Sequence, residues 1–141
     1  MANVIYNSFK GAINSVGWGD NSTTTIKAML VTSGYVPNAD THSFISSVTN
    51  EVTGAGYTAG GKALLNRTIA VDTTNDWAKY DADDSTWATS TITARGVVIY
   101  KDTGTPATSP LIAYIDFVND KSSVDTDFII TWHANGIFVV A

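Results

Sequence analysis

The residue types that most often perform catalysis are sparse in this chain, and their spacing matches no catalytic motif. The two histidines, His42 and His133, stand far apart, and neither belongs to a His-Glu-x-x-His pattern. Serine is common, but the Gly-x-Ser-x-Gly turn of serine hydrolases is missing. Because a Ser, His and Asp can be picked from almost any sequence, these residues indicate surface or strand-end roles. We expect no catalytic residue and no enzyme activity.

The densest group of carboxylates is formed by Asp81, Asp83 and Asp84. Alternating acidic oxygens on a loop can bind calcium, but the twelve-residue calcium loop, with its glycine and terminal glutamate, is absent. A solvated turn is the favoured interpretation, and an ion held by Asp83 and Asp84 at a subunit contact is the alternative. We predict no metal site and no cofactor.

Residues 54–61 contain four glycines, a composition also found in phosphate-binding loops. The Gly-Lys-Ser/Thr ending of a P-loop is missing, and no helix is expected to follow. Glycine here predicts positive φ angles or a close approach of two backbones. The four tryptophans and six tyrosines leave two interpretations open, a sugar-stacking platform or packing in the core and subunit contacts, and the second is favoured.

The composition limits the classes of protein that have to be considered. The 141 residues fit one domain, residues 1–141, and 44% of them are hydrophobic while only 15% are charged. A net charge of -5 with scattered basic residues argues against nucleic-acid binding. The absence of cysteine excludes disulfides and thiolate metal sites. No signal sequence or membrane-spanning run is recognisable, so we expect no membrane partner and synthesis in a cytoplasm.

The strongest structural pattern is a pair of β-prone runs, residues 92–101 and 111–118, separated by turn residues. They predict the central hairpin of a sheet. Strand alternation would place Ile92 and Ala94 on one face with Val98 and Tyr100, and Val97 and Ile99 on the other. Neither face is polar, so we expect both to be covered.

The remaining elements follow in order along the chain. Apolar residues spaced by three and four predict a helix over residues 4–16, capped by Asn3. Thr41 could cap a helical turn within residues 41–48, and a polar turn is expected over residues 119–126. Further strands are predicted at residues 24–31, 68–72, 77–81, 85–89, 128–132 and 137–141. Regular short strands indicate a mainly β fold, an antiparallel β-sandwich (jelly-roll-like) with one short N-terminal helix.

Several segments together carry a family resemblance that covers nearly the whole chain. They read NVIYNSFK (residues 3–10), TIKAMLVT (25–32), VTNEV (48–52), GYTAGG (56–61), TITARGVVIYKD (91–102) and SPLIAYIDF (109–117). In this order they resemble a family of small virion structural proteins of tailed bacteriophages. The resemblance implies a non-enzymatic particle component, with a capsid decoration or cement protein as the preferred assignment.

As a decoration protein, the chain would bind the shell formed by the major capsid protein, as a homo-oligomer (dimer or trimer), and would be located in the virion. A tail- or neck-associated structural protein or receptor (glycan)-binding module is the alternative. Loops and chain ends carry recognition when a sheet supplies the scaffold, so partner contacts are expected at Tyr6, Phe9, Tyr57, Thr58, Phe138 and Val140. The apolar C-terminal strand must also be paired or covered, because a bare apolar edge promotes aggregation.

Overall fold

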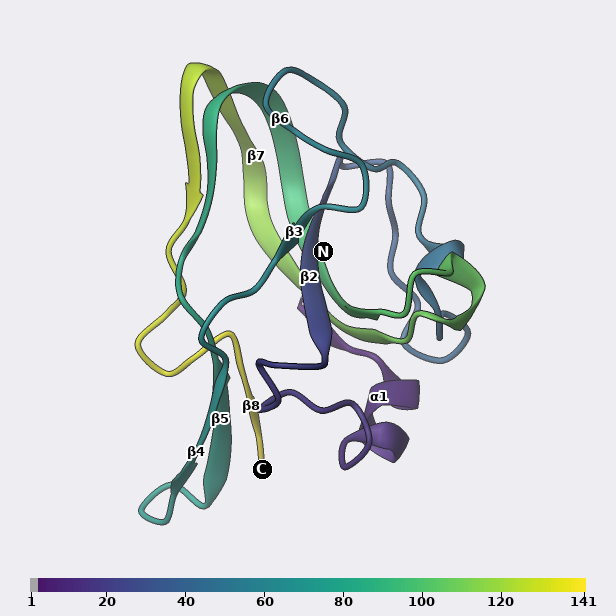
Figure 1. Cartoon of the computed structure of the whole chain (residues 1–141), viewed down its shortest axis with the longest axis vertical. Helices are drawn as coiled ribbons and strands as arrows, with labels where there is room; N and C mark the ends of the chain where they lie inside the picture. The colour runs from purple at the N-terminus through teal and green to yellow at the C-terminus, as the bar shows by residue number, and fades with distance from the viewer. Residues whose placement is uncertain (1–2) are drawn as a thin grey trace.

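The computed structural model describes residues 3–141, which form two antiparallel sheets and one short α-helix (Figure 1). This confirms a mainly β, sandwich-like fold. The five-stranded sheet has the order β1-β7-β6-β2-β3, and the three-stranded sheet has the order β4-β5-β8. The strands are β1 (Val4–Ile5), β2 (Thr25–Val31), β3 (Lys62–Ala63), β4 (Thr68–Asp72), β5 (Trp77–Asp81), β6 (Ser85–Asp102), β7 (Leu111–Ile130) and β8 (Phe138–Val140).

The predicted hairpin is present and much longer than expected. β6 and β7 pair from Tyr100↔Leu111 to Ser85↔Ile130, and we call the two strands together the β6–β7 ribbon. The ribbon bends over near its middle, at the top of Figure 1, so that its second half lies away from β2. The predicted polar turn at residues 119–126 is therefore wrong. Backbone pairing does not depend on side-chain polarity, and these residues continue the ladder with β6 although most of them are exposed.

Both faces of the central strands are covered, as predicted, but the assignment of residues to faces changes at a β-bulge. The pairs Ala94↔Lys121 and Gly96↔Asp116 are separated by two residues on β6 and five on β7. The side-chain alternation along β6 changes across this irregularity, and Ile92 and Ala94 share the larger core cluster with Val97 and Ile99. Val98 and Tyr100 belong to the second cluster instead.

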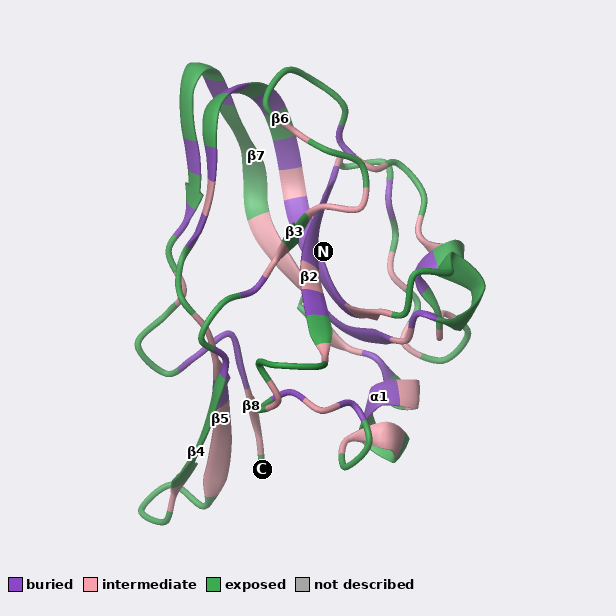
Figure 2. Cartoon of the chain, in the orientation of Figure 1, coloured by how far each residue is buried: buried purple, intermediate pink, exposed green. Residues whose placement is uncertain are grey.

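The larger core cluster joins the two sheets, and the smaller one lies on the opposite face of the five-stranded sheet. In the first, Ile26, Ala28 and Leu30 from β2 meet Tyr80 and Phe138 from the three-stranded sheet. In the second, Met29 and Val31 pack beneath the segment that follows β2. Figure 2 shows buried residues along the middle of β2 and β6 and exposed residues along β4. The central strands are thus rigidly enclosed while the periphery remains open.

The N-terminal helix is shorter than the spacing of apolar residues predicted. Val4 and Ile5 form β1, paired with Tyr114 and Ala113 at the edge of β7, and α1 covers only Asn7–Ala12. Asn3 does not cap it, because its side-chain oxygen accepts a hydrogen bond from the Asp116 amide at 2.7 Å. Edge pairing outcompetes helix formation here, as tertiary contacts commonly override propensity.

The second predicted helical turn also differs in detail. A 3-10 helix spans Ile45–Ser47, follows Phe44 and has no side-chain cap, so the predicted cap at Thr41 is wrong. Another 3-10 helix, Pro106–Thr108, lies in the connection between β6 and β7. Within residues 3–141, none of the helices has the length and hydrophobicity needed to span a membrane.

Candidate interaction surfaces

Three of the six residues expected to contact a partner lie in the core. Tyr6, Phe9 and Phe138 are only 0%, 1% and 8% exposed. The Phe9 ring meets the Phe138 ring edge-on at 5.6 Å, and the Tyr6 and Tyr35 hydroxyls lie 2.7 Å apart in a hydrogen bond. Burial raises the pKa of Tyr6 far above its usual range, with the bonded Tyr35 adding to the effect. These side chains therefore serve packing within the chain.

Tyr57 and Thr58 lie in the glycine-rich segment, which is bound firmly to the five-stranded sheet. The Tyr57 hydroxyl donates to Glu51 Oε2 at 2.7 Å and accepts from the Leu30 amide at 3.1 Å. The Gly60 amide donates to the same carboxylate at 2.7 Å. Burial, and then the hydrogen bond to Glu51, raise the pKa of Tyr57 well above normal. Thr58 remains exposed, so it is the accessible member of this pair.

The glycines of this segment have the conformations that the sequence predicted. Gly56, Gly60 and Gly61 have φ angles of 82°, 94° and 84°. At Gly61 a Cβ atom would lie 2.0 Å from the Ala28 carbonyl oxygen, so the two backbones approach more closely than any other residue permits. The segment is a packing device, and its hydrogen bonds lead to Glu51 and to the sheet.

The two histidines fix local turns. His42 Nδ1 accepts from the Asn38 amide at 3.3 Å and lies 3.0 Å from the Tyr35 hydroxyl. His133 Nδ1 accepts from the Asn135 amide at 3.0 Å. Among the described residues, no three or more His, Asp or Glu side chains form a group that could hold a metal ion.

The acidic segment after β5 is held by hydrogen bonds to neighbouring turns. Asp83 Oδ2 accepts from the Asn66 amide group at 2.6 Å, and Asp84 Oδ1 accepts from the Trp132 main-chain amide at 3.0 Å. The Trp132 indole also donates to the Asp83 carbonyl at 3.1 Å. The two carboxylates thus connect β5 to residues that precede β4 and follow β7.

The aromatic residues are distributed between core and partly covered positions. Trp18 and Trp87 are 2% and 4% exposed, and Trp18 packs edge-on against Tyr80 and Phe138. Trp77 and Trp132 are half-buried. A sugar platform built on Trp18 or Trp87 would require these rings to leave the core.

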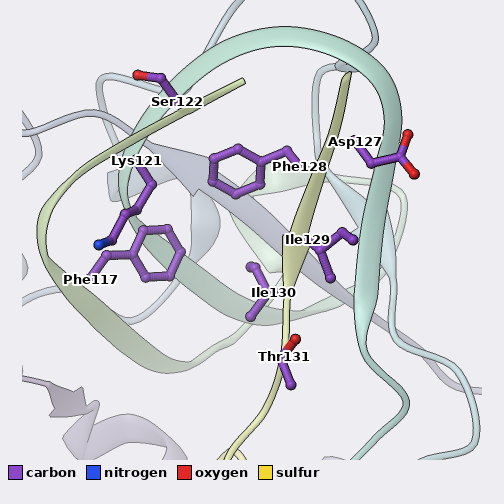
Figure 3. A pocket seen from close by; sticks show the side chains of 8 residues that line it. All are labelled: Phe117, Lys121, Ser122, Asp127, Phe128, Ile129, Ile130 and Thr131. Carbon is purple, nitrogen blue, oxygen red and sulfur yellow. The ribbon is translucent and has the colours of Figure 1, made fainter. Parts of the chain in front are cut away.

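The bend of the β6–β7 ribbon encloses a hollow of about 350 Å³, which the sequence did not reveal (Figure 3). Residues from both halves of β7 line it, because the strand folds back across the bend. The Phe117 and Phe128 rings lie 6.4 Å apart on its apolar side, with Lys121 and Asp127 among its polar members. β7 also carries Val118, Val124 and Ile129, which are 67%, 71% and 56% exposed, and Ile129 lines the hollow.

A second exposed apolar region lies on the hairpin formed by β4 and β5, which we call the arm. It projects from the body at the lower left of Figure 1. Ile69 and Val71 are 47% and 78% exposed, and within the described residues 3–141 β5 is the only strand that pairs with β4. The sequence predicted both strands correctly but contained no signal for their exposure, since TIAVD is equally suited to a buried strand.

Arg67 anchors the base of the arm. Its side chain is buried, and it donates to the main-chain carbonyls of Trp18 at 2.8 Å, Thr24 at 2.7 Å and Leu64 at 3.1 Å, and also to that of Asp20. Burial lowers the pKa of Arg67, while the nearby Asp20 charge opposes this effect. A lone arginine before a strand gives no sequence signal, so this contact depends entirely on the fold.

Comparison of the chain with protein-family models, with curated proteins and with solved structures finds no match.

Proposed function

We propose that this protein is a capsid decoration protein that binds and stabilises the shell formed by a phage major capsid protein. The observation that carries the proposal is the presence of two separate exposed apolar regions on one rigid β-structure. One is formed by residues of β7, namely Val118, Val124 and Ile129; the other lies on the arm and contains Ile69 and Val71. Exposed apolar groups that recur on neighbouring positions typically mark protein contacts.

Two contact regions suit the task of a cement protein. Such a protein must hold the shell and also remain rigid while the shell expands or is heated, so its core must not yield at the contacts. The enclosed central strands meet that requirement, because Val97, Val98 and Ile99 are all 0% exposed. The sequence resemblance to small virion structural proteins points in the same direction. The net charge of -5 also disfavours competition for packaged DNA.

The β7 region is the surface that we assign to the shell. Its hollow, with Phe117 and Phe128 on the apolar side, has the volume to receive an apolar side chain of a partner. Lys121 and Asp127 offer both signs of charge at the same place, as the polar rim of a specific interface requires.

The test is binding to capsids that lack the protein. Purified protein should cosediment with such capsids at a fixed copy number and raise the temperature at which they release DNA. Val124→Asp should weaken this binding at least tenfold, because a charge would replace an exposed apolar contact. Val36→Asp is the matched control, since Val36 is 66% exposed but lies in the loop after β2. Absence of binding by the unmodified protein, or equal losses in both variants, would contradict the proposal.

The alternative, a tail-associated receptor-binding module, has less support from the geometry. A glycan site of stacked aromatics needs accessible ring faces. Trp18 and Trp87 present none, because both are buried in the core. A glycan array probed with the unmodified protein and with Trp132→Ala, whose indole is half-buried, distinguishes the two functions: sugar binding lost in the variant would favour the alternative.

A further inference from the structure

We infer that the free edge of β4 pairs with β4 of a second copy of this chain, in antiparallel orientation about a two-fold axis at Ala70. This inference does not depend on the proposed capsid function. The Ile137 amide donates to the Tyr80 carbonyl at 2.8 Å, so Tyr80 directs its main-chain groups toward β8. Successive strand residues alternate, so Lys79 and Asp81 direct theirs toward β4.

The same alternation applies to β4. Ala70 is paired with Lys79 and Thr68 with Asp81, so Ala70 and Thr68 direct their main-chain groups toward β5. Ile69 and Val71 must then direct their N–H and C=O groups toward the free edge. No other strand pairs with β4 among the described residues, and an open edge of this kind is a template for a further strand.

The sequence of β4 complements itself. With the two-fold axis at Ala70, Ile69 faces Val71 of the second copy, and the two residues exchange both main-chain hydrogen bonds. Symmetry repeats the pair, so four hydrogen bonds close the seam. Thr68 then faces Asp72 of the second copy, whereas an axis at Asp72 would place two carboxylates directly opposite each other. Charge therefore favours the axis at Ala70.

The apolar side chains of the arm continue across this seam. Ile69 is paired with Tyr80, which is paired with Phe138, and all three side chains lie on the face of the sheet that packs against the core. In the same way, Val71 is paired with Ala78, which is paired with Val140. Pairing places the row that begins with Ile69 in one copy beside the row that begins with Val71 in the other. Both Ile69 and Val71 are then covered. A continuous six-stranded sheet, β8-β5-β4-β4-β5-β8, results.

A seam of five residues from each copy buries less surface than the roughly 1,000 Å² that a stable interface typically buries. We therefore expect a reversible dimer. Sedimentation equilibrium should show monomers that convert to dimers as the protein concentration rises. Val71→Pro should abolish the dimer while leaving the arm folded, because it removes only an outward N–H group, and proline is tolerated at strand edges. Circular dichroism and the unfolding midpoint verify the fold of the variant.

A cysteine placed on the two-fold axis tests the register. The chain contains no cysteine, so Ala70→Cys introduces a single thiol. Ala70 would form a non-hydrogen-bonded pair with itself, with Cα atoms about 4.5 Å apart, within the range of a disulfide. Mild oxidation should convert most of this variant to a covalent dimer. Ile69→Cys is the matched control, and it should cross-link at least tenfold more slowly because its partner across the seam is Val71.

Three results would overturn the inference: a protein that stays monomeric at all accessible concentrations, a dimer that Val71→Pro leaves intact, or equal cross-linking of the two cysteine variants. The first would leave the β4 edge free for a strand of a different protein. None of these results bears on capsid binding, which is measured separately.

Discussion

The β6–β7 ribbon and the arm are both antiparallel hairpins, yet they differ in how their side chains are used. In the ribbon, the residues from Val97 to Tyr100 are buried on both faces. In the arm, Tyr80 is 7% exposed at the base, whereas Val71 near the tip is 78% exposed. The same local structure thus serves as enclosed scaffold in one place and as an accessible edge in the other. The difference between the two hairpins depends on which other segments of the chain pack against each of their faces.

The largest difference should appear when equivalent side chains are shortened in the two hairpins. Ile99→Ala should lower the free energy of unfolding by about 3 kcal/mol, because it leaves a cavity in an enclosed core. Ile69→Ala should lower it by less than about 1 kcal/mol, since Ile69 is already 47% exposed. Urea unfolding of both variants measures the difference. Equal losses would show that the arm is as tightly packed as the ribbon.

A second variant tests the anchor that holds the arm to the body. Arg67→Met should lower the free energy of unfolding by about 2–3 kcal/mol, because it leaves buried carbonyls such as those of Trp18 and Leu64 without their donor. Hydrogen exchange should also rise for the amides of β4 while those of β6 stay protected. Lys62→Met, a change at an exposed lysine on β3, is the control. A uniform rise in exchange would mean that Arg67 supports the whole fold rather than the arm.

The smallest effect concerns the pH dependence of the ribbon. Lys27 Nζ lies 2.8 Å from Asp102 Oδ2, and the hydrogen bond from Lys27, followed by that from the Gly104 amide, lowers the pKa of Asp102. The folded carboxyl thus has a lower pKa than the unfolded one. Its contribution to stability is present above the usual aspartate pKa, near 4, and is lost as the pH falls through the folded value.

We expect this contribution to be about 1 kcal/mol or less, since both side chains are partly exposed. When the pH is lowered from 7 to 2.5, the unfolding midpoint should therefore fall further for the unmodified protein than for Asp102→Asn. If the unfolding midpoint of Asp102→Asn fell as far at pH 2.5 as that of the unmodified protein, this ion pair would be excluded as a cause.

Sequence reasoning succeeded where local pattern and local structure coincide. The strands at residues 68–72 and 77–81 were predicted with the bounds that the structure has, because turn residues delimit short alternating runs. The positive φ angles of the glycine-rich segment were also predicted. The face assignment of Ile92 and Ala94 failed, because the irregularity between Ala94 and Gly96 becomes evident only when the pairing of β6 with β7 is known.

The expected contact residues show the same limit. Tyr6, Phe9 and Phe138 belong to chain ends, which are usually peripheral, and this position favours a contact role for them. In the structure β8 is a strand of the three-stranded sheet, and the rings of Phe9, Tyr80 and Phe138 pack together. Tyr6 is buried in the second cluster. Most of the large exposed apolar residues lie instead on β4 and β7, where no sequence pattern distinguishes a covered strand from an open one.

The sequence by itself determined the mainly β class, most strand positions, the glycine conformations and the acidic character of the surface, because each of these depends on residue type and short-range spacing. The tertiary structure alone decided which apolar side chains are covered, where the ribbon bends and which strand edge stays free. Exposure is a property of what lies opposite a residue, and in this chain the opposing residues come from distant positions. Arg67, which joins four carbonyls across residues 18–64, is the clearest example.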